Sequence, residues 1–321
     1  MIEKMIEQSE FPSIAIVLVN LNSYEDTLLC IESLQTITYP NIEIILVDNG
    51  SKDYSGTRLL EKFPCVTYLR SDENLGFTGG NNLGIDYALK SGCKHILLLN
   101  NDTTVTPGFL EPLVDRLETD PKIAAVGGKI YYAPSARNGS TNILWYAGSY
   151  RKWHSGFSHY GVDKQDQGDF DIAAEVPYAC GCLMLMRGDT IRQIGSLSNE
   201  YFIYWEEADW CERAREAGYV SFYEPKSVIN HNFKSSNLGK ETPFHNYLQF
   251  RNAFIFSSKH HRGLRRVQFL LFYPVLALYR LIQDLRFNNT RGAKAIVWGI
   301  FDYFRGYRGK CGLRERGLLK Q

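Results

Sequence analysis

Short aliphatic runs alternate with amphipathic segments along the first 130 residues. Residues 13–19, 42–47 and 96–99 are almost entirely aliphatic, which is typical of strands buried on both faces of a parallel sheet. Between the first two runs, residues 25–34 carry apolar side chains at helical spacing. This alternation predicts an α/β fold, with a Rossmann-like, mostly parallel sheet flanked by helices.

The pattern changes after residue 130. Residues 131–161 are rich in Tyr, Trp, Gly and Ser and predict a β-hairpin or a loop insertion. Residues 175–186 predict a single strand interrupted by Gly181, where a ligand or another backbone often approaches closely. Residues 206–217 predict a helix that stops before Gly218.

The predicted strands end in polar turns at 20–22, 48–53 and 100–102. Structural turns also favour Asn and Asp, but three such turns at one edge of a sheet are a stronger signal. In open α/β sheets, ligands bind outside the carboxyl ends of the strands. A carboxylate such as Asp102 can hold a divalent cation, which in turn holds a diphosphate. The alternative is that Asp102 only caps the next turn.

The glycine-rich stretch 74–84 opens another predicted helix. It does not fit the G-x-G-x-x-G fingerprint of dinucleotide-binding proteins, and it follows the third strand instead of the first. Its glycines would let the backbone approach a phosphate or a sugar at a helix N-terminus.

Three carboxylates follow an aromatic run at 201–205: Glu206, Glu207 and Asp209. The helix dipole favours acids in a first turn, which explains them structurally. Crowding by aromatic rings and by other carboxylates also raises a carboxyl pKa, which suits a general base. Further along, His231 ends a β-rich run, where a single histidine is most often structural.

Composition and cysteine content indicate the type of protein and its cellular compartment. The chain has 321 residues, of which 44% are hydrophobic and 22% charged, as in ordinary globular proteins. The seven cysteines include no pair of CxxC elements, so we predict no zinc site and reduced thiols. The N-terminus lacks the features of a signal peptide, which predicts a cytoplasmic protein.

The C-terminal tail is basic and aromatic. From residue 259 onward there are 14 Lys or Arg against 3 Asp or Glu. The uncharged run 267–279, flanked by Arg265, Arg266 and Arg280, is too short to span a bilayer. It predicts an amphipathic helix lying at a membrane surface. The alternatives are a helical subdomain and a contact between copies of the chain. Nucleic-acid binding is disfavoured, because long apolar runs interleave the basic residues.

Taken together, residues 13–255 resemble the family 2 glycosyltransferases of the GT-A fold, with the closest likeness to the rhamnosyltransferase-like branch. The likeness lies in the first loop at 19–22, the turn at 47–51, the loop at 74–82 and Leu99-Asn100-Asn101-Asp102. The resemblance implies a nucleotide-sugar donor held by Val19, Asn20, Asn22, Asp48, Ser51, Asn74, Gly79, Gly80, Asn81, Asn101 and Asp102. Asp48 would pair with the pyrimidine of the donor.

The same resemblance implies a metal site and a catalytic base. Asn100 stands where the family carries the first acid of its metal-binding motif, so Asp102, with His231, would hold Mn²⁺ or Mg²⁺. The residues Trp205-Glu206-Glu207 match the segment of the catalytic base, which falls on Glu207. Glu stands here for the usual Asp, so the choice between Glu207 and Glu206 is left open. Gly181, Trp205 and Asp209 would bind the acceptor.

The implied function is inverting, metal-dependent transfer of a sugar to a saccharide or lipid-linked saccharide in cell-surface polysaccharide synthesis. dTDP-rhamnose is the favoured donor, with UDP-hexoses and UDP-galactofuranose as alternatives. The competing classes are a non-catalytic binding protein of the same fold and a nucleotide-dependent oxidoreductase. The expected organisation is a flexible N-terminus (1–12), a donor half (13–130), an acceptor and catalytic half (131–255) and a helical tail (256–321). The tail would place the protein peripherally at the inner face of the membrane.

Overall fold

A computed structural model describes residues 11–137, 139–153, 156–233 and 242–318. Most of the predicted flexible N-terminus, residues 1–10, lies outside the described residues. The chain divides into two compact units. The sheet unit comprises residues 1–150, 159–197 and 210–234, and the helical unit comprises 151–158, 198–209 and 235–321. The sequence-based division at residues 130 and 255 does not coincide with these units.

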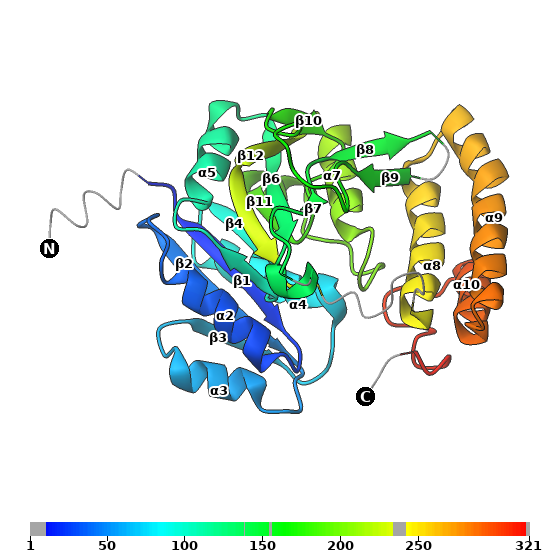
Figure 1. The fold of residues 1–321 in the computed structure, drawn as a ribbon, viewed down its shortest axis with the longest axis horizontal. Helices are drawn as coiled ribbons and strands as arrows, with labels where there is room; N and C mark the ends of the chain where they lie inside the picture. Colours follow the sequence, from blue (N-terminus) through cyan, green and yellow to red (C-terminus); the bar gives the residue numbers. More distant parts are fainter. Residues whose placement is uncertain (1–10, 138, 154–155, 234–241, 319–321) are drawn as a thin grey trace, which may run out of the picture. The chain divides into compact units, whose positions relative to one another are not determined.

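The sheet unit is built on one mixed sheet with the strand order β10-β12-β6-β11-β4-β1-β2-β3 (Figure 1). Strands β3, β2, β1 and β4 run parallel, while β11 runs antiparallel to both β4 and β6. β5 adds to β12 and β7 adds to β6. The strands are β1 (Ile14–Asn20), β2 (Ile42–Asn49), β3 (Thr67–Ser71), β4 (His95–Leu99), β5 (Thr103–Val105), β6 (Ile123–Tyr132), β7 (Leu144–Tyr146), β10 (Ala174–Val176), β11 (Leu183–Arg187) and β12 (Val220–His231).

Helices connect these strands, as the sequence pattern predicts. They are α2 (Tyr24–Leu34), α3 (Ser55–Lys62), α4 (Gly76–Lys90), α5 (Leu110–Thr119) and α6 (Gly188–Ile194), with a 3₁₀ turn η1 (Pro134–Arg137). Helix α7 (Glu206–Glu216) begins in the helical unit and ends in the sheet unit. Gly218 lies just beyond the end of this helix. Its positive φ of 92°, which glycine adopts without strain, turns the chain away from the helix axis.

Helix α4 lies close to strand β1 because two glycines face the strand. A Cβ added to Gly80 would lie 2.7 Å from Val19 Cγ1, and one added to Gly84 would lie 2.4 Å from Val17 Cγ1. Both positions lie one turn apart on the same face of the helix. The contact fixes the start of α4 beside the carboxyl end of β1, where the polar turns gather.

One strand prediction is wrong. Residues 175–186 form two strands, β10 and β11, instead of one strand interrupted by Gly181. β10 pairs with β12, whereas β11 lies between β4 and β6. Pro177 follows β10 directly and has no amide hydrogen to donate to a ladder, so the chain leaves one strand and enters another. The predicted hairpin within 131–161 is confirmed as β8 (Ser149–Lys152) and β9 (Gly156–His159).

The helical unit contains α8 (Pro243–His260), α9 (Gly263–Arg286) and α10 (Thr290–Phe304), which lie side by side (Figure 1). Thr242 caps α8 by accepting a hydrogen bond from His245 N, and Pro243 takes the first helical position. A core of buried, mostly aromatic side chains joins the three helices: Phe250, Ala253, Phe254, Phe269, Tyr273, Ala277 and Ile296. The predicted C-terminal helical extension is therefore confirmed, although its first helix begins at Pro243. Within the described part of the chain, no helix combines the length and the apolarity that crossing a membrane requires.

Candidate functional site

The three predicted turns lie at the carboxyl ends of neighbouring parallel strands. Asn20 ends β1, Asp48 pairs in register with it on β2, and Asn100 follows β4. Because parallel strands end at the same edge of a sheet, these turns form one polar rim. The Gly181 segment joins this rim, since Asn100 N donates to Cys182 O at 3.0 Å.

Asn20 is the centre of a buried hydrogen-bond network. Its Nδ2 donates to Ser51 Oγ at 3.1 Å and to Ser55 Oγ at 2.8 Å, and its Oδ1 accepts from Thr27 Oγ1 at 3.1 Å. Asn101 joins the network by donating to Thr27 Oγ1 at 2.7 Å. Asn20 is 0% exposed. The structure therefore gives Asn20 the task of holding the rim together, while its predicted contact with the donor stays a prediction.

Asn22 and Ser51 tie the first two turns to each other. Asn22 N donates to Ser51 Oγ at 3.0 Å, and Asn22 Oδ1 accepts from Lys52 N at 2.8 Å. Asn22 has a φ of 52°, a conformation that asparagine tolerates better than most residues. The two predicted donor loops thus form one rigid element.

Asp48 is a charged residue of this rim and is almost fully buried. Its Oδ1 accepts from Ser51 N at 3.0 Å, and its Oδ2 accepts from Tyr68 OH at 2.9 Å and from Arg70 Nη1 at 3.3 Å. Burial, followed by the hydrogen bond to Asp48, raises the pKa of Tyr68. Sequence reasoning missed Tyr68 and Arg70. Their alternate spacing on β3, beside the turn at 48–53, is the signal that could have found them.

The loop that opens α4 is shaped by Asn49, which sequence reasoning also left out of the site. Asn49 Nδ2 donates to Gly76 O at 3.0 Å, and its Oδ1 accepts from Leu75 N at 3.0 Å. Asn74 Oδ1 accepts from Gly76 N at 2.8 Å, and Asn81 Nδ2 donates to Phe77 O at 2.9 Å. The predicted donor loop is therefore fixed to the end of β2.

The glycines of this loop serve packing in the structure. A Cβ on Gly79 would lie 2.6 Å from Leu75 Cβ, and one on Gly80 would meet Val19. On both glycines, the space that a side chain would occupy is filled by other residues of the protein and not by an open site. Their contact with a donor therefore stays a prediction.

Asp102 and His231 meet at the rim, although 129 positions separate them in the chain. His231 pairs in register with Thr103 on β5, and Asn232 N donates to Asp102 O at 2.8 Å. This pairing brings His231 Nε2 to 3.1 Å from Asp102 Oδ1. His231 is 3% exposed, with Trp145 packed edge-on at a ring centroid distance of 4.7 Å.

The donor set of this pair fits a divalent cation. With metal–ligand bonds of about 2.1 Å, two ligands at right angles lie about 3.0 Å apart, which is close to the separation of His231 Nε2 and Asp102 Oδ1. The described residues contain no group of three or more His, Cys, Asp or Glu side chains that could enclose a metal. A cation here would therefore take its other ligands from the substrate and water, as Mg²⁺ commonly does.

The aromatic run before the acids, in the helical unit, has an unusual backbone. Phe202, Tyr204 and Trp205 have φ values of 76°, 72° and 79°. Such angles cost non-glycine residues about 1–3 kcal/mol each and persist only where the surroundings enforce them. We call residues 201–205 the strained loop.

Two buried side chains of α8 enforce this conformation. Asn252 Nδ2 lies within 3.1 Å of three loop carbonyls, those of Tyr201, Ile203 and Tyr204. Arg251 Nη2 donates to Tyr201 O at 2.9 Å, and its Nε donates to Asn252 Oδ1 at 3.0 Å. Both side chains are 0% exposed. They lie in the segment YLQFRN (247–252), to which sequence reasoning assigned no role.

The three carboxylates after the loop differ in their surroundings. Asp209 Oδ1 accepts from Tyr201 OH and from His260 Nε2, each at 2.9 Å, and lies 3.0 Å from Lys259 Nζ. Glu206 is buried, and its Oε2 has no hydrogen-bond partner among the described residues. Burial, followed by the charge of Glu207, raises the pKa of Glu206 well above its usual range. Glu207 is only partly buried.

The predicted site residues therefore fall into two groups. The predicted donor and metal residues and Gly181 lie in the sheet unit, whereas Trp205, Glu206, Glu207 and Asp209 lie in the helical unit. Trp205 Nε1 donates to Gln249 Oε1 at 2.8 Å, so α8 holds this side chain too. Acceptor binding by Gly181, Trp205 and Asp209 stays a prediction.

Comparison with known proteins places these observations in a family. The model of the family described as "Glycosyl transferase family 2" matches residues 15–195. An N-acetylglucosaminyl-diphospho-decaprenol L-rhamnosyltransferase of Mycobacterium tuberculosis is 24% identical over 253 residues, which cover 72% of this chain and 79% of that protein. The low-salt glycan biosynthesis hexosyltransferase Agl10 of Haloferax volcanii is 24% identical over 320 residues, 97% of this chain and 96% of that protein.

A solved structure is similar in fold. The crystal structure of GalNAc-T7 with UDP, GalNAc and Mn²⁺ superposes with a TM-score of 0.60 at 15% identity. The match covers 77% of this chain and 48% of that one, so this chain spans about half its length. A likeness at this identity concerns the fold alone, and it confirms the predicted GT-A architecture.

Proposed function

Because the chain belongs to glycosyl transferase family 2 and is thus a glycosyltransferase, we propose that it moves a hexose from a nucleotide diphosphate to a hydroxyl of a saccharide or lipid-linked saccharide. dTDP-rhamnose is the favoured donor, which the rhamnosyltransferase among the relatives supports. UDP-hexoses and UDP-galactofuranose are the alternative donors. The product would enter cell-surface polysaccharide synthesis.

The observation that carries this proposal is the pair Asp102–His231. Strand pairing between β5 and β12 places a carboxylate oxygen and an imidazole nitrogen 3.1 Å apart at the polar rim. These two residues would hold Mn²⁺ or Mg²⁺. When bound, the cation supplies Lewis-acid stabilisation of the diphosphate leaving group. Asp48 and the loop opened by Asn74 would orient the rest of the donor.

Glu207 is the base in this proposal. Glu207 is partly exposed, whereas Glu206 is buried and its raised pKa favours the neutral form. Glu207 takes the proton from the acceptor hydroxyl as its oxygen attacks the anomeric carbon, and the bond to the diphosphate breaks with inversion.

We further propose that the protein works at the inner face of the membrane. Helix α9 presents a stripe of exposed apolar side chains, spaced three or four residues apart: Leu264, Val267, Leu271, Val275, Leu278, Ile282 and Leu285. An apolar stripe on a basic helix is typical of helices that lie in the headgroup region. A lipid-linked acceptor would explain why such a surface is useful.

Thermal unfolding with candidate ligands tests the proposal. We expect dTDP-rhamnose or a UDP-sugar to raise the midpoint only when Mn²⁺ or Mg²⁺ is present, and transfer to follow with that donor. The Glu207→Gln variant should keep this donor-induced shift but lose transfer. Stabilisation by NAD without any response to nucleotide sugars would contradict the proposal. Donor binding without transfer or hydrolysis would favour the non-catalytic alternative.

A further inference from the structure

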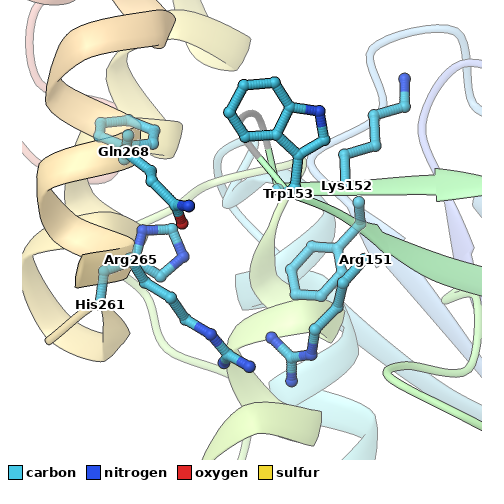
Figure 2. Close-up of a pocket in the computed structure, with 9 residues that line it drawn as sticks. Arg151, Lys152, Trp153, His261, Arg265 and Gln268 are labelled. Atoms are coloured by element: carbon cyan, nitrogen blue, oxygen red, sulfur yellow. The ribbon is translucent and has the colours of Figure 1, made fainter. Parts of the chain in front are cut away.

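A cavity of about 260 Å³ lies within the helical unit, between residues 151–153 and 156–157 of the β8–β9 segment and the first turns of α9 (Figure 2). Basic side chains line it: Arg151 and Lys152 from β8, His261 from the C-terminal cap of α8, and Arg265 from the first turn of α9. No Asp or Glu is among its lining residues. Such a cavity suits an anion.

The charges converge at one end of the cavity. Figure 2 shows the guanidinium groups of Arg151 and Arg265 pointing toward one another. Among the described residues, no carboxylate lies within ion-pair distance of Arg265 or Lys152. Guanidinium groups bind phosphate oxygens through paired hydrogen bonds. Two of them at one end can hold a group with several phosphate oxygens.

The other wall of the cavity is aromatic and continues to Phe272 of α9, which follows Leu271 of the exposed stripe in the chain. Trp153 and Phe269 line the cavity, and the ring of Trp153 lies 4.6 Å, centroid to centroid, from that of Phe272. Trp153 and Phe272 are 62% and 39% exposed. If an anionic head group occupies the cavity, an apolar chain attached to it can therefore run along α9 and stay in contact with apolar side chains throughout.

The cavity also adjoins the segment of the candidate base. The rings of Phe157 and Trp205 lie 6.2 Å apart, and a Cβ added to Gly156 would lie 2.6 Å from Trp205 Cη2. Trp205 directly precedes Glu206 and Glu207. A head group bound here would thus carry its first sugar close to these carboxylates, all within one unit.

We propose that this cavity binds the diphosphate of a prenyl-diphosphate-linked acceptor, whose lipid chain follows the exposed stripe of α9. The inference rests on the proposed glycosyl transfer and assigns the residues that recognise the acceptor. Arg151 and Arg265 bind the phosphates, and Trp153 guides the first part of the lipid.

Binding of farnesyl diphosphate to the full chain, measured by calorimetry without vesicles or donor, tests this assignment. We expect Arg265→Gln to raise the Kd about tenfold, and Arg151→Gln with Arg265→Gln to raise it further. The matched control is Arg286→Gln, an exposed arginine about 30 Å away at the other end of α9, which should bind like the wild type. Farnesol should bind much more weakly than farnesyl diphosphate.

Several results would overturn the inference. If farnesol and farnesyl diphosphate bind equally well, the cavity does not recognise the diphosphate. If Arg286→Gln weakens farnesyl diphosphate binding as much as Arg265→Gln does, the binding reflects general charge attraction and not a specific site. If anionic phospholipid vesicles bind through Arg265 but farnesyl diphosphate does not bind, the cavity is a bilayer headgroup site instead.

Activity assays separate this inference from the proposed function. In wild-type protein, transfer to a phosphate-free glycoside tests the reaction itself. If that transfer occurs and Arg265→Gln raises KM only for the prenyl-diphosphate acceptor, both proposals hold. If transfer occurs but Arg265→Gln and Arg286→Gln behave alike with both acceptors, the cavity assignment fails and the reaction stands. If no acceptor is used while farnesyl diphosphate binding depends on Arg265, the proposed reaction fails and the anion site stands.

Discussion

At the scale of single residues, the site depends on a few buried polar side chains with distinct duties. Asn20 and Asn49 satisfy backbone and side-chain partners and hold the turns in place. Asp102 and His231 present a carboxylate and an imidazole to each other. Buried polar groups that are hydrogen-bonded stabilise a structure, and those left without partners are expensive. His231 Nδ1, buried without a partner among the described residues, is therefore a cost that function explains better than stability.

The metal assignment predicts a specific loss in Asp102→Asn. The substitution keeps the size of the side chain but removes the charge that binds a cation. We expect the Mn²⁺-dependent part of the donor-induced shift in unfolding temperature to disappear, and kcat to fall about 100-fold or more. Asp115→Asn, an exposed aspartate on α5, is the matched control. An Asp102→Asn variant that still responds to Mn²⁺ would refute the assignment.

The raised pKa of Glu206 predicts a pH-dependent stability. Its pKa in the folded chain lies above the ordinary value of 4.5, because of burial and then of Glu207. The neutral carboxyl therefore contributes stability below about pH 4.5, and this stability is lost as the pH rises toward the folded pKa. Glu206→Gln stays neutral throughout, so its unfolding temperature should exceed that of the wild type at neutral pH.

Thermal unfolding of the wild type and Glu206→Gln between about pH 4.5 and neutral pH measures this effect. The two proteins should converge at the acidic end. Glu61→Gln, an exposed glutamate on α3, should show no such trend. A constant difference between Glu206→Gln and the wild type at every pH would mean that Glu206 is not perturbed as described.

At the scale of elements, helix α8 holds the strained loop in place through hydrogen bonds from two buried side chains. Three left-handed residues among the four before Glu206 set the direction in which α7 starts. Arg251 and Asn252 hold that loop by its carbonyl groups. Backbone strain of this kind collects at functional sites, where the surrounding structure enforces it. We infer that α8 positions the carboxylates without touching substrate.

Asn252→Asp tests this positioning role. The carboxylate would face the three loop carbonyls and repel them, so the loop should relax from its left-handed conformation. We expect kcat to fall about 10- to 100-fold, with KM for the donor unchanged. Ser258→Ala, which removes a hydrogen bond to Ile255 O on the same helix, should leave kcat unchanged. A parallel loss in the two variants, or a rise in donor KM, would indicate general destabilisation.

At the scale of the whole molecule, charge and apolar surface are unevenly distributed. Residues 1–258 carry 22 Lys or Arg against 32 Asp or Glu, whereas the remainder is strongly basic. The exposed apolar stripe of α9 lies in the basic part. Contiguous exposed apolar surface on a soluble domain marks an interaction site, and the basic surroundings favour an anionic membrane surface.

Sedimentation with anionic vesicles tests the membrane proposal. The double variant Leu271→Gln and Val275→Gln removes two exposed side chains from the middle of the stripe. Each buries part of its apolar surface on binding, so we expect partitioning to fall about tenfold or more. Leu29→Gln on α2, which is 52% exposed, is the control and should bind normally. Undiminished binding of the double variant would indicate that the stripe serves another contact.

The sequence by itself determined the parallel core of the sheet and the positions of the site turns. Aliphatic runs such as 96–99 must be buried on both faces, and the polar residues that follow must lie at the carboxyl edge. These are local consequences of hydrophobic pattern and chain direction. They were sufficient to select Asp102 as a candidate, whereas the acidic segment at 206–209 was selected by its three carboxylates and the aromatic run before them.

Only the tertiary structure decided which distant residues meet and what each side chain does. The pairing of β5 with β12 brings His231 to Asp102, and α8 reaches back to the strained loop. The split of residues 175–186 into β10 and β11 depends on partners that lie elsewhere in the chain. The hydrophobic pattern of a segment does not show which distant segment it pairs with, because strand register and burial are properties of the folded pair.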